Sequence, residues 1–243
     1  MFSERGPSLW ELAVQALSSV ERGYDLLAPK FDHTPFRTPD HVLDATADAL
    51  RPFGPFGQGL DVCCGTGAGM RVLGPLCDGR LCDGRVTGVD FSSGMLAQAR
   101  RAHPDAGWVR ADVRDLPFRE AFDLAVTFGA LGHVLPSERP ALFGGVYRAL
   151  RPGGLFAFPV GAPPPIASLQ YWALLGFDVV MRVRNAVWRP PFVMYYRTCP
   201  LHALRSDLAA AGFTVTTVPL TALGTREDGT PRGRLVLARK PGG

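Results

Sequence analysis

Leu60–Met70, with the sequence LDVCCGTGAGM, is the stretch that decides the fold. A short apolar run that includes an aspartate leads into a loop with glycine at positions 65, 67 and 69. Such a run followed by a glycine loop is typical of a buried strand that turns into a helix N-terminus, where open α/β sheets bind their ligands. The stretch therefore predicts the first strand of a nucleotide-binding sheet and leaves the kind of nucleotide open.

The spacing of the glycines disfavours two common nucleotide sites. A dinucleotide fingerprint requires a third glycine at position 70, where this chain has Met70. A phosphate-binding P-loop requires Gly-Lys-Ser/Thr at its end, and no such triplet follows the loop. Nucleoside-triphosphate hydrolysis is therefore disfavoured, and a nicotinamide oxidoreductase remains only as a rival class.

Strand and helix patterns alternate after residue 60. We expect strands at 60–64, 85–90, 108–112, 122–128 and 155–160, and helices at 69–76, 93–102 and 136–150. This alternation predicts βαβ units and a parallel sheet. A helix at 200–212 and strands at 214–220 and 232–240 predict an antiparallel hairpin that closes the sheet, while residues 8–50 read as helical around an aromatic connector at 24–32.

Three aspartates end or interrupt the first three predicted strands. Asp61 lies within the first strand, where a carboxylate would repel a pyrophosphate but can meet an ammonium group. Asp90 ends the second strand, where a carboxylate can accept both hydroxyls of a ribose. Asp112 ends the third strand beside the backbone N–H of Val113, a pair that matches the edge of adenine. An amine, a ribose and an adenine without phosphate describe S-adenosylmethionine.

The chain resembles a class I S-adenosylmethionine-dependent methyltransferase, of the small-molecule kind that includes the quinone-biosynthesis C-methyltransferases. The stretches that carry the resemblance occur in order at residues 60–67, 86–96, 111–118, 122–134 and 150–155. The resemblance implies an α/β fold with a doubly wound, Rossmann-like, seven-stranded sheet whose last strand is antiparallel. It also implies S-adenosylmethionine as the cofactor.

The same resemblance implies roles for single residues. The expected cofactor-binding residues are Tyr24 over the methionine portion; Asp61, Cys63, Gly65, Thr66 and Gly67 around the methionine end; Asp90 on the ribose; Phe91, Met95, Asp112 and Val113 around the adenine; and Thr127 and Phe128 beside the sulfonium. Tyr24 has an alternative role in packing the N-terminal helices.

Two positions depart from the family pattern. Cys63 stands where the family usually has a glycine, and we interpret Cys63 and Cys64 as small core residues rather than nucleophiles. Gly132 stands where many members have the first of two histidines, so that His133 is alone. His133 is either a general base facing the acceptor or a packing residue before the next helix.

The chain divides into four predicted parts of one methyltransferase domain. These are a helical N-terminal cap (1–54), a cofactor-binding core (55–160), an acceptor lid inserted at 161–200, and a C-terminal helix and hairpin (201–243). The lid is rich in aromatic residues, and the predicted substrate contacts are Tyr171, Trp172, Trp188, Tyr195 and Tyr196. Its alternative role is a homodimer interface, and its arginines are also compatible with an anionic acceptor or a membrane surface.

Composition limits the remaining classes. The net charge is +4 without basic runs, which disfavours nucleic acid as a partner. Five cysteines without a pairing pattern, the lack of a signal-peptide pattern and the lack of a long uncharged apolar run predict a soluble cytoplasmic protein without a membrane span. The tetrapeptide CDGR occurs at 77–80 and again at 82–85; we interpret it as a loop duplication and expect no metal site.

The expected function is transfer of a methyl group from S-adenosylmethionine to O, N or C of a small, partly apolar molecule, which could be aromatic or lipid-like. Catalysis would rest mainly on proximity and orientation. The alternative is a regulatory protein that binds S-adenosylmethionine without catalysis.

Overall fold

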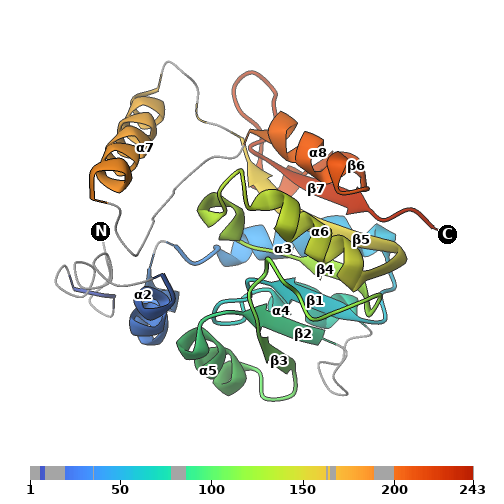
Figure 1. Ribbon diagram of the computed structural model, residues 1–243. Coiled ribbons are helices and arrows are strands. Elements are labelled where there is room, and N and C mark those ends of the chain that lie inside the picture. The colour runs from blue at the N-terminus through green and yellow to red at the C-terminus, as the bar shows by residue number, and fades with distance from the viewer. Residues whose placement is uncertain are drawn as a thin grey trace.

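The computed structural model describes residues 6–8, 20–34, 36–77, 86–162, 164, 168–188 and 200–242. A central sheet carries helices on both faces, with α2 (Val20–Leu27) and α7 (Leu169–Trp188) to one side of it (Figure 1). The predicted α/β class is confirmed.

The sheet has seven strands within the described residues, in the order β3-β2-β1-β4-β5-β7-β6. The strands are β1 (Gly59–Val62), β2 (Val86–Asp90), β3 (Gly107–Arg110), β4 (Phe122–Val126), β5 (Leu150–Gly161), β6 (Thr214–Pro219) and β7 (Gly233–Arg239). The first five pair in parallel, and β7 is antiparallel to both β5 and β6. The predicted doubly wound sheet with an antiparallel last strand is therefore confirmed. The strand order reverses between β1 and β4, and open α/β sheets bind ligands outside the carboxyl ends of the strands at such a point.

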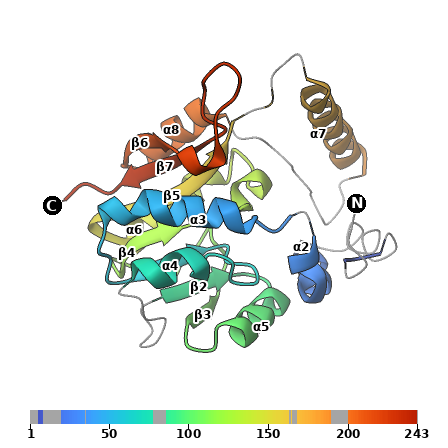
Figure 2. The ribbon, with the colours of Figure 1, turned by 180° about the vertical axis from the view of Figure 1, so that it is seen from behind.

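Successive residues of the central strands alternate between two apolar cores. In β4, Leu124 and Val126 belong to one core and Ala125 to the other. The first core packs against α3 (Asp40–Leu50) and α4 (Met70–Leu76), and the second against α6 (Arg139–Ala149) and α8 (Leu201–Ala210). Figure 2 shows α3 and α4 in front of the sheet, on the face opposite to α6 and α8 in Figure 1. The sheet is therefore buried on both sides, which explains its continuous apolar strands.

Several short helices complete the described chain. They are α2 (Val20–Leu27), α5 (Ser93–Ala102) and four 3-10 helices: η1 (Ala28–His33), η2 (Arg51–Phe53), η3 (Ala130–His133) and η4 (Thr221–Leu223). α2 and η1 occupy part of the segment expected to be a turn-rich connector, so this expectation was wrong for residues 24–32. The break between α2 and η1 comes at Pro29, which occupies one of the first two positions of η1, where a missing N–H is tolerated. The helix expected at 8–17 lies almost entirely outside the described residues.

Two boundaries differ from the predicted ones by three residues or more. α6 begins at Arg139 rather than at 136. β5 begins at Leu150 rather than at 155, because its pairing with β4 starts at Leu150 and then shifts register before Leu155. The duplicated tetrapeptide falls at residues 77–85, of which only Cys77 is described; Cys77 is a buried core residue.

The predicted lid contains a 20-residue helix, α7, that the sequence reading did not assign. In both views it stands apart from the sheet and its covering helices (Figures 1 and 2). Among the described residues no helix is long and apolar enough to cross a membrane. The cytoplasmic location and the boundaries of the four parts stay predictions.

Candidate functional site

Asp61 is a buried carboxyl group at the carboxyl end of β1. Only 1% of the residue is exposed, and its Oδ2 atom has no hydrogen-bond partner among the described residues. Burial, followed by repulsion from Asp90, raises the pKa of Asp61 to about 8, although a hydrogen bond from the Gly69 N–H lowers it in part. A buried polar atom without a partner is costly, and it marks a place where a ligand can supply the missing contact.

Gly69 explains the third glycine of the loop. A Cβ atom at this position would lie 2.3 Å from Asp61 Oδ2, so any side chain here would force the buried carboxyl group to move. The backbone thus passes directly against the carboxyl group as α4 begins at Met70. The loop is shaped around the acid of β1 rather than around a phosphate.

The turn between β1 and α4 uses left-handed backbone conformations. Gly65 has φ +53° and Gly67 has φ +94°, and Cys63 also has a positive φ, of +57°. A non-glycine residue in this region is strained by about 1–2 kcal/mol, so Cys63 retains the backbone shape that the family pattern assigns to glycine. Burial, then the charges of Asp90, Asp61 and Asp112, raise the pKa of the Cys63 thiol. A thiol held neutral in this way fits a small filling residue better than a nucleophile.

Asp90 joins the tips of β1 and β2. Its Oδ2 atom accepts a hydrogen bond from the Gly65 N–H at 2.9 Å, and its Oδ1 atom accepts one from the Ser92 N–H at 2.9 Å. Burial raises the pKa of Asp90, against these backbone hydrogen bonds, which lower it. A carboxylate has about four acceptor positions, so both oxygens retain capacity for hydroxyl donors.

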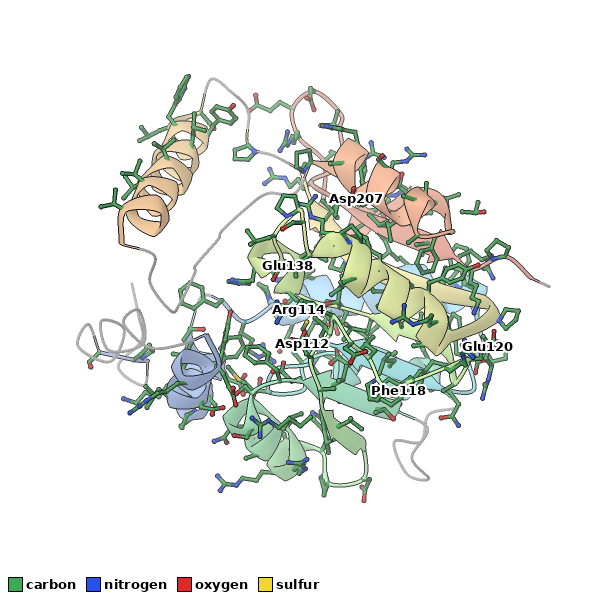
Figure 3. All side chains as sticks on the ribbon, in the orientation of Figure 1. Asp112, Arg114, Phe118, Glu120, Glu138 and Asp207 are labelled. Carbon is green, nitrogen blue, oxygen red and sulfur yellow. The ribbon has the colours of Figure 1, made fainter. Side chains whose placement is uncertain are left out.

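Asp112 follows β3 and is exposed. Arg114 holds it through two forked contacts, of which the Arg114 Nη2–Asp112 Oδ2 distance is 2.6 Å, and Arg114 Nη1 also contacts Glu138 Oε1 at 2.8 Å. The hydrogen bonds from Arg114 hold the pKa of Asp112 below its ordinary value. Figure 3 shows the three side chains together at the carboxyl edge of the sheet. Arg114 was missed by the sequence reading and would share Asp112 with any adenine amine.

Three further predicted residues meet from the cap, the tip of β2 and the segment after β4. Tyr24 on α2 meets Phe91 and His133 edge to face, with ring centroids 6.0 Å and 6.2 Å apart. Burial, then Asp90 and Cys63, raise the pKa of Tyr24, so its hydroxyl stays protonated near neutral pH. Burial lowers the pKa of His133, which favours the neutral imidazole. The structure therefore brings together an N-terminal residue, an adenine-wall residue and the candidate base.

Some predicted residues have structural contacts of their own. The Thr127 hydroxyl donates to the Val62 carbonyl oxygen at 2.7 Å, so this group ties β4 to β1. Met95 on α5 is 2% exposed and lies in the interior. Phe128 packs partly buried against the core beside α3 and α4, and Val113 packs partly buried against the opposite core.

Asp25 on α2 fixes the N-terminus of α5, which begins next to Asp90. Ser92 caps this helix, accepting from the Met95 N–H, and donates its hydroxyl to Asp25 Oδ1 at 2.5 Å. Asp25 Oδ1 also accepts from the Gly94 N–H at 2.8 Å. Burial opposes ionisation of Asp25, but the hydrogen bonds from Ser92, Gly94 and Ser93 outweigh it and lower its pKa. The cap is thus part of the support of the second strand tip.

A second contact ties the cap to the glycine loop. Thr66 in the loop donates its hydroxyl to Asp32 Oδ1 on η1 at 2.7 Å. Asp25 and Asp32 were both missed by the sequence reading, because neither lies in a motif and each acts on a residue more than 30 positions away.

The predicted substrate contacts lie in or after α7. Tyr171 is half-buried and its ring meets that of Trp172 at 5.5 Å, while Trp172 is 58% exposed. Trp188 ends α7, but its side chain is not among those described, and Tyr195 and Tyr196 lie outside the described residues. The role of these residues as substrate contacts stays a prediction.

Residues 60–154 match the family model described as a methyltransferase domain. The chain is 37% identical over 99 residues to an uncharacterized methyltransferase of Synechocystis sp., an alignment that covers 40% of this chain and 44% of that protein. It is 36% identical over 137 residues to the demethylmenaquinone methyltransferase of Beutenbergia cavernae, covering 55% of this chain and 51% of that one. The chain thus spans about half the length, or less, of these curated relatives.

Among solved structures, the DhpI–SAH complex is similar to this chain with a TM-score of 0.63 and 20% identity. The similarity covers 96% of this chain and 99% of that chain. At this level of identity it shows a shared fold, and the shared fold extends over the cap and the hairpin as well as the matched domain.

Proposed function

We propose that this chain, whose residues 60–154 match the model of a methyltransferase domain, is a class I enzyme that transfers a methyl group from S-adenosylmethionine to a small, partly apolar acceptor. One observation carries the proposal: the unpartnered, buried Oδ2 atom of Asp61 behind the glycine loop, next to Asp90. A donor that offers a positive amine and two ribose hydroxyls satisfies both acids, whereas a phosphate would face two carboxyl groups.

The residues present fit such a donor. Gly69 leaves room only for backbone against Asp61, and Gly65 presents its N–H to Asp90 rather than to a phosphate oxygen. Asp61 would hold the amine, Asp90 the ribose, and Phe91 with Asp112 and Val113 the adenine. When bound, S-adenosylmethionine supplies an electrophilic methyl group on a sulfonium.

The chain's own contribution is to orient the acceptor, exclude water and take up a proton. Tyr24 stands between Phe91 and His133, so closure of the cap removes water from the strand tips. His133, held neutral by burial, can accept the proton that a hydroxyl or carbon acid loses as it attacks. Positioning is expected to supply most of the rate.

The chemical class of the acceptor is inferred from one relative and from the aromatic residues near the end of β4. The demethylmenaquinone relative is named for a quinone, and the aromatic rings of Tyr24, His133 and Phe128 near the β4 tip suit a flat, apolar acceptor. We therefore propose a quinol or another phenol-like molecule. A contribution from Tyr171, Trp172, Trp188, Tyr195 and Tyr196 stays a prediction.

Calorimetry with S-adenosylhomocysteine tests the donor site. Asp90→Ala is expected to weaken binding about 10- to 150-fold, because it removes charge-assisted hydrogen bonds worth roughly 1.5–3 kcal/mol. Asp115→Ala, at an exposed acid in the loop after β3, is the matched control and should leave binding unchanged. Equal affinity of Asp90→Ala and wild type would refute the donor site.

Release of S-adenosylhomocysteine in the presence of quinols, phenols or acyl acceptors tests the reaction. Donor binding without release for any acceptor would favour the regulatory, non-catalytic alternative. Binding of NAD in preference to S-adenosylhomocysteine would favour the oxidoreductase class.

A further inference from the structure

The outer face of α7 is a stripe of exposed apolar side chains. Nine large hydrophobic residues are exposed among those described, and seven of them lie on this one helix. They are Leu169, Trp172, Leu175, Val179, Val180, Val183 and Val187, with exposed fractions from 40% to 86%. Most side chains drawn on α7 project away from the sheet (Figure 3). Exposed apolar patches of this kind mark interaction sites.

Most residues of the stripe lie on one side of the helix axis. At about 100° per residue, Leu169, Trp172, Val179, Val180, Val183 and Val187 fall within an arc of about 100° on one side of the helix. α7 therefore presents one continuous apolar face along its length, and such a face is suited to lying in an interface.

The net charge of the segment around α7 favours an anionic lipid surface over a second copy of the chain as the partner of the stripe. Residues 161–200 hold four arginines and one aspartate, a net charge of +3, whereas the whole chain has a net charge of +4. Two copies facing each other through this segment would bring like charges together, which disfavours a symmetric dimer. An anionic lipid surface offers both an apolar layer for the stripe and a charge of the opposite sign.

We propose that α7 docks the protein on an anionic membrane surface, with the stripe at the level of the headgroups and upper acyl chains. The helix is 20 residues long, which corresponds to about 30 Å lying flat along the surface. Docking needs no methyl donor, so it stands or falls independently of the proposed reaction. A docked protein would take an acceptor from the lipid phase, a consequence that does rest on the proposed function.

Vesicle flotation with the full chain tests the docking. Partition onto phosphatidylcholine vesicles with about 30% phosphatidylglycerol should exceed partition onto pure phosphatidylcholine at least about tenfold, because the segment that contains α7 has a net positive charge. Raising the salt from about 0.05 M to 0.5 M should reduce this difference, because salt screens the attraction. Equal or absent partition on both vesicles at low salt overturns the proposal.

Single substitutions locate the surface. Val183→Glu, in the middle of the stripe, should lower partition about tenfold or more. Phe53→Glu, at an exposed apolar residue on η2, is the matched control and should leave partition unchanged. Circular dichroism and thermal unfolding of both variants establish that they fold.

Two other results would also overturn the proposal. In the absence of lipid, a dimer that dissociates on Val183→Glu, together with no vesicle binding, would assign the stripe to a second copy. A rise in the acceptor KM of Val183→Glu without any vesicle binding would assign it to the chain's own acceptor site.

Discussion

The affinity for the donor should depend on pH through Asp61. Its carboxyl group is protonated in the ligand-free protein below about pH 8, because burial and Asp90 raise its pKa to about 8. An ammonium group placed against it favours the carboxylate, so binding must release the proton. The association constant for the donor is therefore expected to rise with pH up to the pKa of Asp61 in the ligand-free protein and then to level off.

The size of the effect can be worked out from that pKa. If the bound-state pKa falls below about 5, the association constant increases by about 50-fold between pH 6 and pH 8, and by less than about twofold above pH 8. Nearly one proton should be released per ligand at pH 6.5.

Isothermal titration with S-adenosylhomocysteine, in buffers with different ionisation enthalpies, measures both the affinity and the protons released. Asp61→Asn is the control, because the amide cannot titrate and any remaining pH dependence belongs to the ligand. A wild-type affinity that changes by less than about threefold from pH 6 to pH 8, in parallel with Asp61→Asn, would refute the reasoning.

Four further outcomes are expected. Gly69→Ala should destabilise the fold by about 2 kcal/mol or more and abolish donor binding, since its Cβ would lie 2.3 Å from a carboxyl oxygen, whereas Gly161→Ala, with open space around its Cβ, should be near neutral in urea unfolding. Cys63→Gly should raise the free energy of unfolding by about 0.5–1 kcal/mol by relieving its left-handed strain, and an unchanged urea midpoint would contradict this. Asp25→Asn should cost about 1 kcal/mol of unfolding free energy and speed proteolysis of the cap at pH 7; because the pKa of Asp25 is lowered, the difference should vanish only in acid. If His133 is the general base, His133→Gln should remove the acidic limb of the turnover–pH profile. Full turnover by His133→Gln would show that His133 only packs against its neighbours.

The core of the fold follows from local patterns in the chain. The apolar run at β1, the repeated strand-end acids and the alternation after residue 60 predict the parallel sheet, because buried parallel strands need apolar residues on both faces. Asp61 in β1 and Gly69 at the start of α4 flank one short loop, so their contact is also within reach of sequence reasoning.

The remaining parts depend on contacts between distant residues. Nothing near Asp25 indicates that it holds the N-terminus of α5, and nothing near Arg114 indicates that it joins Asp112 to Glu138, 24 positions further along the chain. α7 was missed although Ser168 stands at its N-terminus and accepts a hydrogen bond from the Tyr171 N–H at 3.2 Å. A single serine after a run of prolines is a weak helix signal, and tertiary context decides such segments.

The position of β7 restricts the order in which the chain can fold as it is made. This strand lies between β5 and β6 but is the last to be synthesised. Until it is inserted, β5 and β6 each present an unpaired edge, and such edges are templates for association with other chains. A premature stop before Gly233 is therefore expected to yield aggregated chains rather than a smaller folded product.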